Sequence, residues 1–249
     1  KEDSMSGHSK WNNIKRKKEK TDGQKAKIFT KIGREMAVAI KEGGSSDPNS
    51  NSKLRELIAK AKANNVPNDN IERIIKKASA DDKAKYETVV YEGYGPCGVA
   101  VIVETLTDNR NRTAGDIRHY FDKYGGNLGT TGCVSFMFTE KGVIIADGED
   151  VDEDKAMEDF MEAGADDFNF DDEDTIEIIT APADVTAVAT AIEEKGYKVI
   201  SADAAQVPST YTSIDDPDTA VKMNRLLEML EDNDDVQNVW HNWENPTEE

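Results

Sequence analysis

The amino-acid sequence changes near residue 80 in a way that limits the chain to a fold of at least two different parts. Before this point apolar residues recur at helical spacing, and beyond it short strand-like segments alternate with short helices. The charge changes at the same place. Residues 5–80 carry 18 Lys and Arg against 8 Asp and Glu, whereas residues 81–249 carry 12 against 40. The net charge of −19 therefore hides a basic first region.

Three helices are predicted in this basic region, which we take to begin at Met5. The first covers residues 24–42 and ends at two glycines, and the second follows a loop rich in Ser, Asn and Pro. The third begins after Pro67, where Asp69 and Glu72 have the spacing of a capping box. Each helix carries Lys and Arg away from its apolar face, so the region presents several cations to solvent.

Clustered cations of this kind attract the phosphates of nucleic acids, although a merely solvated helix face is the alternative. Trp11, beside several cations, suits base stacking, and a core anchor is its alternative role. Two further arginines lie in a loop of the acidic part, where pairing with nearby acids competes with phosphate contact. The candidate nucleic-acid-binding residues are Lys10, Trp11, Lys15, Arg16, Lys17, Lys18, Lys27, Lys31, Arg34, Arg73, Lys76, Lys77, Arg110 and Arg112.

The acidic part begins with segments typical of a sheet. Strands are predicted over residues 86–91 and 99–104, and the second has no polar alternation, which favours a central strand covered on both faces. A polar loop and N-cap then lead to a helix that ends near Tyr124. A further strand is predicted over residues 127–138. Its apolar side chains alternate onto one face: Val134, Phe136 and Phe138.

Residues 142–206 show the order βαββαβ, which is the split βαβ unit of ferredoxin-like folds. A last helix and strand follow it. We therefore predict an α+β fold with an N-terminal helical domain followed by two ferredoxin-like α/β domains, the second inserted into the first. The predicted domains are residues 5–80, a discontinuous unit of residues 81–138 and 208–249, and an acidic insert of residues 139–207.

The residues also argue against several classes of protein. No nucleophile, phosphate-loop or zinc motif is present, and the three histidines lie in different modules, so we expect no enzyme and no cofactor. The acidic run between Glu149 and Asp174 lacks metal-loop spacing. No run approaches the roughly 18 apolar residues of a membrane span. The two cysteines form no CxxC pair, which favours a cytoplasmic protein.

Several strings, in this order along the chain, resemble the YebC family. They are MSGHSKW at 5–11, KIFTK at 27–31, PNDNIER at 67–73, YEGYGP at 91–96, LTDNRNRT at 106–113 and GGNLG at 125–129. One departure is Cys97, which stands where the family usually has Gly in a Gly-Pro-Gly-Gly turn. The resemblance implies three domains, one inserted in another, and a cytoplasmic nucleic-acid-binding role.

Members of this family are labelled DNA-binding transcriptional regulators, and others are described as ribosome-associated translation factors that relieve stalling on proline-rich nascent chains. Our leading hypothesis is a non-enzymatic, monomeric factor whose basic region binds ribosomal RNA on the ribosome. The alternative is a DNA-binding transcriptional regulator that uses the same region. A third class, an acidic scaffold that binds anionic membranes, is disfavoured because the helices lack a bulky apolar face.

Overall fold

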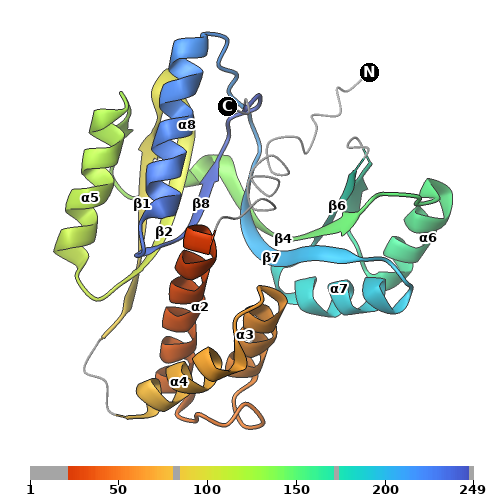
Figure 1. Ribbon diagram of the computed structural model, residues 1–249. Helices are drawn as coiled ribbons and strands as arrows, with labels where there is room; N and C mark the ends of the chain where they lie inside the picture. Colours follow the sequence, from red (N-terminus) through yellow and green to blue (C-terminus); the bar gives the residue numbers. More distant parts are fainter. Residues whose placement is uncertain (1–21, 81–84, 171–173, 247–249) are drawn as a thin grey trace.

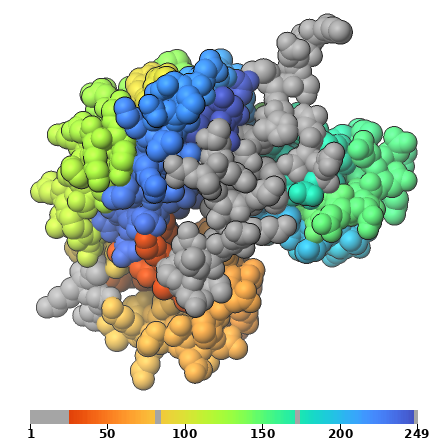
Figure 2. All heavy atoms as spheres, turned by 45° about the horizontal axis from the view of Figure 1, so that its top comes forward, coloured from red at the N-terminus to blue at the C-terminus, as the bar shows by residue number. Residues whose placement is uncertain are grey.

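The computed structural model describes residues 22–80, 85–170 and 174–246 of the chain. Figure 1 shows an N-terminal group of helices and two sheets, each with its own pair of helices. In the space-filling view of Figure 2, helices α3 and α4 form a lobe apart from the lobe built by the second sheet. The predicted α+β class, with a helical N-terminal part and two α/β parts, is confirmed.

The helical region forms where the sequence predicts it. Its helices are α2 (Asp22–Gly43), α3 (Ser52–Ala63) and α4 (Asn68–Ser79). Their apolar faces meet in a core of their own, which includes Ile32, Met36, Leu54, Leu57 and Ile71. The first helix ends at the glycine pair, since Gly44 has a φ of +63° that favours a residue without a Cβ.

The predicted capping box of α4 is wrong. The helix begins after Pro67, which makes no side-chain capping bond, and Asp69 lies inside the first turn instead of before it. The backbone N–H of Val66 bonds back to the carbonyl of Ala61 in a tight turn, and the carbonyl of Pro67 then accepts the N–H groups of Asn70 and Ile71, which begins the helix at Asn68. In the first turn Asp69 acts through the helix dipole instead.

The first sheet has the antiparallel strand order β3-β1-β2-β8. Its strands are β1 (Glu87–Tyr94), β2 (Ala100–Thr107), β3 (Asn127–Leu128) and β8 (Val236–His241). Helices α5 (Arg110–Lys123) and α8 (Pro217–Asp232) pack on one face, around a core that includes Phe121, Met223 and Trp243. Strand β2 is central and almost wholly buried, as its unbroken apolar pattern predicts.

The second sheet has the order β5-β6-β4-β7, again antiparallel throughout. Its elements are β4 (Phe138–Asp147), α6 (Glu153–Ala163), β5 (Asp167–Asn169), β6 (Thr175–Thr180), α7 (Val185–Glu194) and β7 (Val199–Pro208). This is the split βαβ arrangement. Because β8 belongs to the first sheet, the second unit is inserted into the first. The exact domain limits given above stay a prediction.

The predicted strand over residues 127–138 is wrong. Within it, Asn127 and Leu128 pair as strand β3 and the last residue, Phe138, begins β4, whereas the residues between them form a loop and a 3-10 turn (Ser135–Met137). The buried carboxylate of Glu92 explains the change, since it accepts the backbone N–H groups of Gly132 at 2.8 Å, Val134 at 3.0 Å and Ser135 at 2.8 Å. These amides are bound to a side chain instead of a neighbouring strand, and Phe136 points outward, 74% exposed.

Cys97 lies at the tip of the turn between β1 and β2, in a short 3-10 turn (Pro96–Gly98). Its φ is +56°, in the left-handed region that favours glycine. The conformation agrees with the glycine that the resemblance implies at this place. Cys97 is exposed, so nothing crowds its side chain.

The parts of the molecule are joined in two different ways. Trp240 of β8 packs against two buried apolar clusters, one that includes Ile102 of the first sheet and one that includes Val143 of the second, so apolar packing links the two α/β units. The core of the helical region, in contrast, contains no side chain from either sheet among the described residues. Ion pairs and hydrogen bonds connect that region to the α/β units, and several of the candidate residues form them.

Candidate nucleic-acid interface

Six of the candidate residues belong to the first 21 residues of the chain. Lys10, Trp11, Lys15, Arg16, Lys17 and Lys18 lie outside the described residues. The eight remaining candidates fall into two groups that differ in their surroundings. Four contact acidic or carbonyl oxygens of the chain itself, and four lie exposed on α4 and at the start of α5.

The first group faces the carboxyl end of α8. Lys27 forms an ion pair of 2.7 Å with Asp232, and Lys31 donates a hydrogen bond of 2.8 Å to the backbone oxygen of Glu231. In Figure 1 the first turns of α2 lie beside this end of α8. The last turn of α8 contains no basic residue, although cations are favoured there by the helix dipole. Helix α2 supplies the missing positive charge.

Arg34, one turn further along α2, contacts the loop after α8. Its guanidinium donates to the carboxylate of Asp235 at 2.5 Å, to the backbone oxygen of Asp234 at 2.9 Å and to that of Leu106 at 3.2 Å. It also lies 5.6 Å from the centre of the Tyr86 ring, a cation–π distance. Arg34 thereby ties α2 to the first sheet and to the loop before β8.

Asp235 is the centre of this network and is only 3% exposed. Its second carboxylate oxygen accepts from Arg112 at 2.8 Å and from the hydroxyl of Thr113 at 2.7 Å. Burial alone raises the pKa of Asp235, but the hydrogen bonds from Arg112, Thr113 and Arg34 outweigh it and lower the pKa. A charged Asp235 therefore holds α2, α5 and the loop before β8 together.

The two arginines at the start of α5, Arg110 and Arg112, have different surroundings. Asn109 caps α5 by accepting the backbone N–H of Arg112, as expected. The Arg112 side chain pairs with Asp108 at 2.9 Å as well as with Asp235, and these hydrogen bonds raise its pKa further above the ordinary value. Arg110 is exposed at the first position of the helix. Arg112 is also exposed, at 45%, but two carboxylates engage it, so Arg110 is the more available of the two to an outside ligand.

The second group lies mainly on α4. Arg73, Lys76 and Lys77 are exposed, and Lys76 and Lys77 stand in the last turn of that helix. Arg73 donates a hydrogen bond of 2.8 Å to Asn70, a neutral partner. The candidate set missed two further exposed cations, Arg55 and Lys62, which lie seven residues apart on one side of α3. Their spacing of two helical turns is the signal that identifies them.

A second polar contact joins the helical region to the inserted unit. Lys60 of α3 lies 3.7 Å from Glu35 of α2 and 3.7 Å from Asp203 of β7. Burial tends to lower the pKa of Lys60, but the two carboxylates outweigh it and raise that pKa. Glu35 has a raised pKa because it is desolvated, although Lys60 opposes this effect. The helical region thus contacts both sheets through charged side chains.

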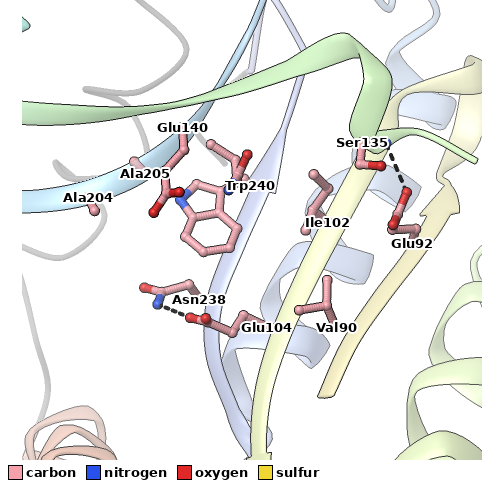
Figure 3. A pocket seen from close by; sticks show the side chains of 11 residues that line it. Val90, Glu92, Ile102, Glu104, Ser135, Glu140, Ala204, Ala205, Asn238 and Trp240 are labelled. Atoms are coloured by element: carbon pink, nitrogen blue, oxygen red, sulfur yellow. Dashed lines mark hydrogen bonds between the residues drawn. The ribbon is translucent and has the colours of Figure 1, made fainter. Parts of the chain in front are cut away.

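A cleft of 280 Å³ lies between the two sheets, and Figure 3 shows its walls. Trp240 and Ile102 form its apolar part, and the Glu104 and Glu140 carboxylates line its polar part. Glu104 accepts a hydrogen bond of 2.7 Å from Asn238. The charged groups that line the cleft are carboxylates, so the cleft has an unfavourable charge for phosphate.

Two further properties concern the part of the chain that the structure describes. No cluster of three or more His, Cys, Asp or Glu side chains is arranged there to hold a metal ion. None of the described helices has the length and apolar content required to span a bilayer.

The fold and this surface define a class: a protein with a basic helical region attached to two four-stranded α/β units. Family models match both parts, one described as the TACO1/YebC protein N-terminal domain over residues 9–81, the other as the TACO1/YebC second and third domain over residues 86–243. The chain belongs to the TACO1/YebC family. The resemblance inferred from the sequence is confirmed.

Relatives match along almost the whole chain. A protein from Acetivibrio thermocellus is 60% identical over 241 residues, which cover 96% of this chain and 99% of its own. One from Ruminiclostridium cellulolyticum is 57% identical and covers 98% of each chain. Both are named probable transcriptional regulatory proteins. The crystal structure of a conserved hypothetical protein from Aquifex aeolicus superposes with a TM-score of 0.81 at 42% identity, and covers 92% of this chain and 94% of its own.

Proposed function

We propose that this protein is a non-enzymatic, nucleic-acid-binding regulator of gene expression, and that its helical region binds RNA on the ribosome. The observation that carries the proposal is the set of exposed cations on α4, in a protein whose net charge is −19. Lys76 and Lys77 at the end of the helix can approach a phosphate backbone while the acidic units stay away from it.

Two further points support the proposal. The exposed cations Arg55 and Lys62 on α3 extend the surface beyond α4, so a run of phosphates can be followed instead of a single one. The printed names of the relatives, probable transcriptional regulatory proteins, agree with a regulator that binds nucleic acid. Binding in the cytoplasm, as a monomer and without a small-molecule substrate or cofactor, belongs to the same proposal.

The relatives' names also favour a second candidate, a DNA-binding transcriptional regulator that uses the same surface. The RNA hypothesis rests on the resemblance to family members that support translation. The two candidate functions predict different binding partners in a cell lysate. An RNA-directed factor should sediment with ribosomal particles, whereas a transcriptional regulator should bind particular duplex sites at physiological salt.

The test is the triple variant Arg73→Glu, Lys76→Glu, Lys77→Glu. We expect it to lose sedimentation with ribosomes and to bind RNA more weakly. Neutralising the same three residues with Gln should reduce the slope of log K against log salt by about 2 if all three contact single-stranded phosphates, since each contact contributes roughly 0.7. Circular dichroism checks that α4 still forms.

The matched control is Arg118→Glu, Lys123→Glu, Lys222→Glu, which makes the same charge change at exposed positions of α5 and α8. It should sediment like the natural protein. Equal losses in both variants would show a general charge effect and contradict a site on α4. Loss of duplex binding with no ribosome association in either protein would favour the DNA regulator, and binding to anionic vesicles alone would favour the membrane scaffold.

A further inference from the structure

We propose that the acidic carboxyl end of α8 occupies the basic face of α2 as an internal substitute for phosphate, so that nucleic-acid binding at this face is coupled to separation of the helical region from the first sheet. The proposal rests on the proposed function and names how the same basic region is regulated. We call residues 231–235, at the end of α8 and in the loop after it, the acidic clamp.

The contacts of the acidic clamp resemble those that a phosphate chain makes. Carboxylate oxygens lie 2.7 Å from Lys27 and 2.5 Å from Arg34, distances expected of charge-assisted hydrogen bonds to an anion. Backbone oxygens at 2.8 Å and 2.9 Å complete the contacts of Lys31 and Arg34. While the clamp is in place, these three cations have less positive potential to offer an outside polyanion.

The way in which the two regions are joined makes opening feasible. The apolar core of the helical region is complete within α2, α3 and α4, and includes no side chain of the first sheet among the described residues. Separation therefore exposes charged groups to water and leaves that core intact. The Lys27–Asp232 pair is open to solvent, with side chains 36% and 59% exposed, so salt and competing phosphates can reach it.

Asp235 forms two kinds of bond, some within the first α/β unit and one to the helical region. Its Arg112 and Thr113 bonds lie within the first α/β unit and hold the carboxylate in place whether or not α2 is present. Among the residues that the structure describes, its bond to Arg34 is the one that crosses to the helical region. The carboxylate is thus already in position to receive a cation. The coupling is reciprocal: the factor by which clamp closure lowers the affinity for nucleic acid is also the factor by which bound nucleic acid lowers the equilibrium constant of clamp closure.

The test compares two double variants that each remove two negative charges. Asp232→Asn with Asp235→Asn weakens the clamp, and Asp215→Asn with Asp218→Asn changes exposed residues around the start of α8, at the opposite end from the clamp. Binding of a fluorescent RNA of about 20 nucleotides should tighten about tenfold in the clamp variant, within the usual range of coupling factors. The control should tighten much less.

A second readout needs no nucleic acid. Spin labels at Ala63→Cys on α3 and Asp122→Cys on α5, in a background of Cys97→Ser and Cys133→Ser, report the distance between the two regions. The distance should lengthen or broaden when salt rises from about 50 to 500 mM, since screening weakens exposed pairs. In the clamp variant it should do so already at low salt. Asp232→Asn alone serves if the buried substitution impairs folding.

The outcomes separate the clamp from the proposed function. A distance that responds neither to salt nor to the clamp variant overturns the clamp, even if RNA binding is strong. Equal tightening by the clamp variant and the control also overturns it. If the natural protein and every variant bind neither RNA nor duplex DNA, the proposed function fails, whereas a salt-dependent distance would still establish that the acidic end of α8 holds α2.

Discussion

Helices α2 and α4 carry the same kinds of cation and meet different surroundings. Lys27, Lys31 and Arg34 of α2 face the carboxyl end of α8, where oxygens lie 2.5 Å to 2.8 Å away. Lys76 and Lys77 of α4 are exposed. A basic residue alone therefore does not identify a nucleic-acid site. The acidic groups that the fold places beside it determine how much positive potential is available to a ligand.

The two helices should also differ in what their cations contribute to stability. The carboxylate of Asp235 is buried and Arg34 is only 17% exposed, whereas Arg112 is 45% exposed. Removal of Asp235 therefore leaves the largely buried guanidinium of Arg34 without its charged partner. An exposed lysine in the last turn of α4 interacts mostly with solvent and with the helix dipole. Four measurements test this contrast.

The largest effect is expected for Asp235→Ala. It leaves Arg34 and Arg112 facing each other without the shared carboxylate, and should lower the free energy of unfolding by about 3 to 5 kcal/mol. Urea unfolding measures the change. The control is Asp234→Ala, because Asp234 contacts Arg34 through its backbone oxygen, which the substitution keeps. Similar losses from both variants would show that the buried carboxylate has no special role.

A smaller loss is expected for Arg34→Ala. The substitution removes the bonds to Asp235 and to two backbone oxygens, but Asp235 keeps Arg112 and Thr113. We expect the free energy of unfolding to fall by about 2 kcal/mol, the range for hydrogen bonds to charged groups. A double-mutant cycle with Asp235→Ala measures the coupling directly. Strict additivity of the two substitutions would mean that the bond contributes nothing to stability.

The dependence of stability on pH should be visible but modest. The folded-state pKa of Asp235 is lowered from the ordinary 3.8, so its contribution is complete above that value and is lost as the pH falls through the folded pKa. The difference in unfolding free energy between the natural protein and Asp235→Asn should therefore shrink as the pH is lowered below the ordinary value of 3.8 and through the folded-state pKa. A constant difference over that window would contradict the lowered pKa.

The smallest effect is expected on α4. Substituting Arg73, Lys76 or Lys77 singly by Ala should change the free energy of unfolding by less than about 0.5 kcal/mol, since each side chain is exposed. Thermal and urea unfolding both apply. A loss comparable to that of Arg34→Ala would mean that α4 cations also stabilise the fold, and the contrast between the helices would disappear.

Much of the fold could be predicted from local patterns. The spacing of Ile32 and Met36 predicts the buried face of α2, and the unbroken apolar run of β2 predicts a central strand. Local patterns gave a wrong prediction where a side chain distant in sequence binds the backbone. The carboxylate of Glu92 binds amides some 40 residues away, and it turns an expected strand into a loop with Phe136 exposed.

The candidate site shows the same division. Sequence reasoning selected Arg73, Lys76 and Lys77, which lie exposed, because cations opposite an apolar helix face point to solvent. It grouped them with Lys27, Lys31 and Arg34, whose oxygen partners are not visible in any local pattern. It also left out Arg55, although the spacing to Lys62 places both on one side of α3. Nucleic-acid binding by any of these residues stays a prediction.

The amino-acid sequence by itself determined the helices, most strands, the insertion of one α/β unit in the other and the separation of charge, because periodicity and composition act over a few residues. Only the tertiary structure decided which cations remain available. Lys31 and Glu231 are 200 positions apart, and their contact exists because the fold sets the start of α2 against the end of α8. Charges act through space, so the partner of a charge is a property of the fold.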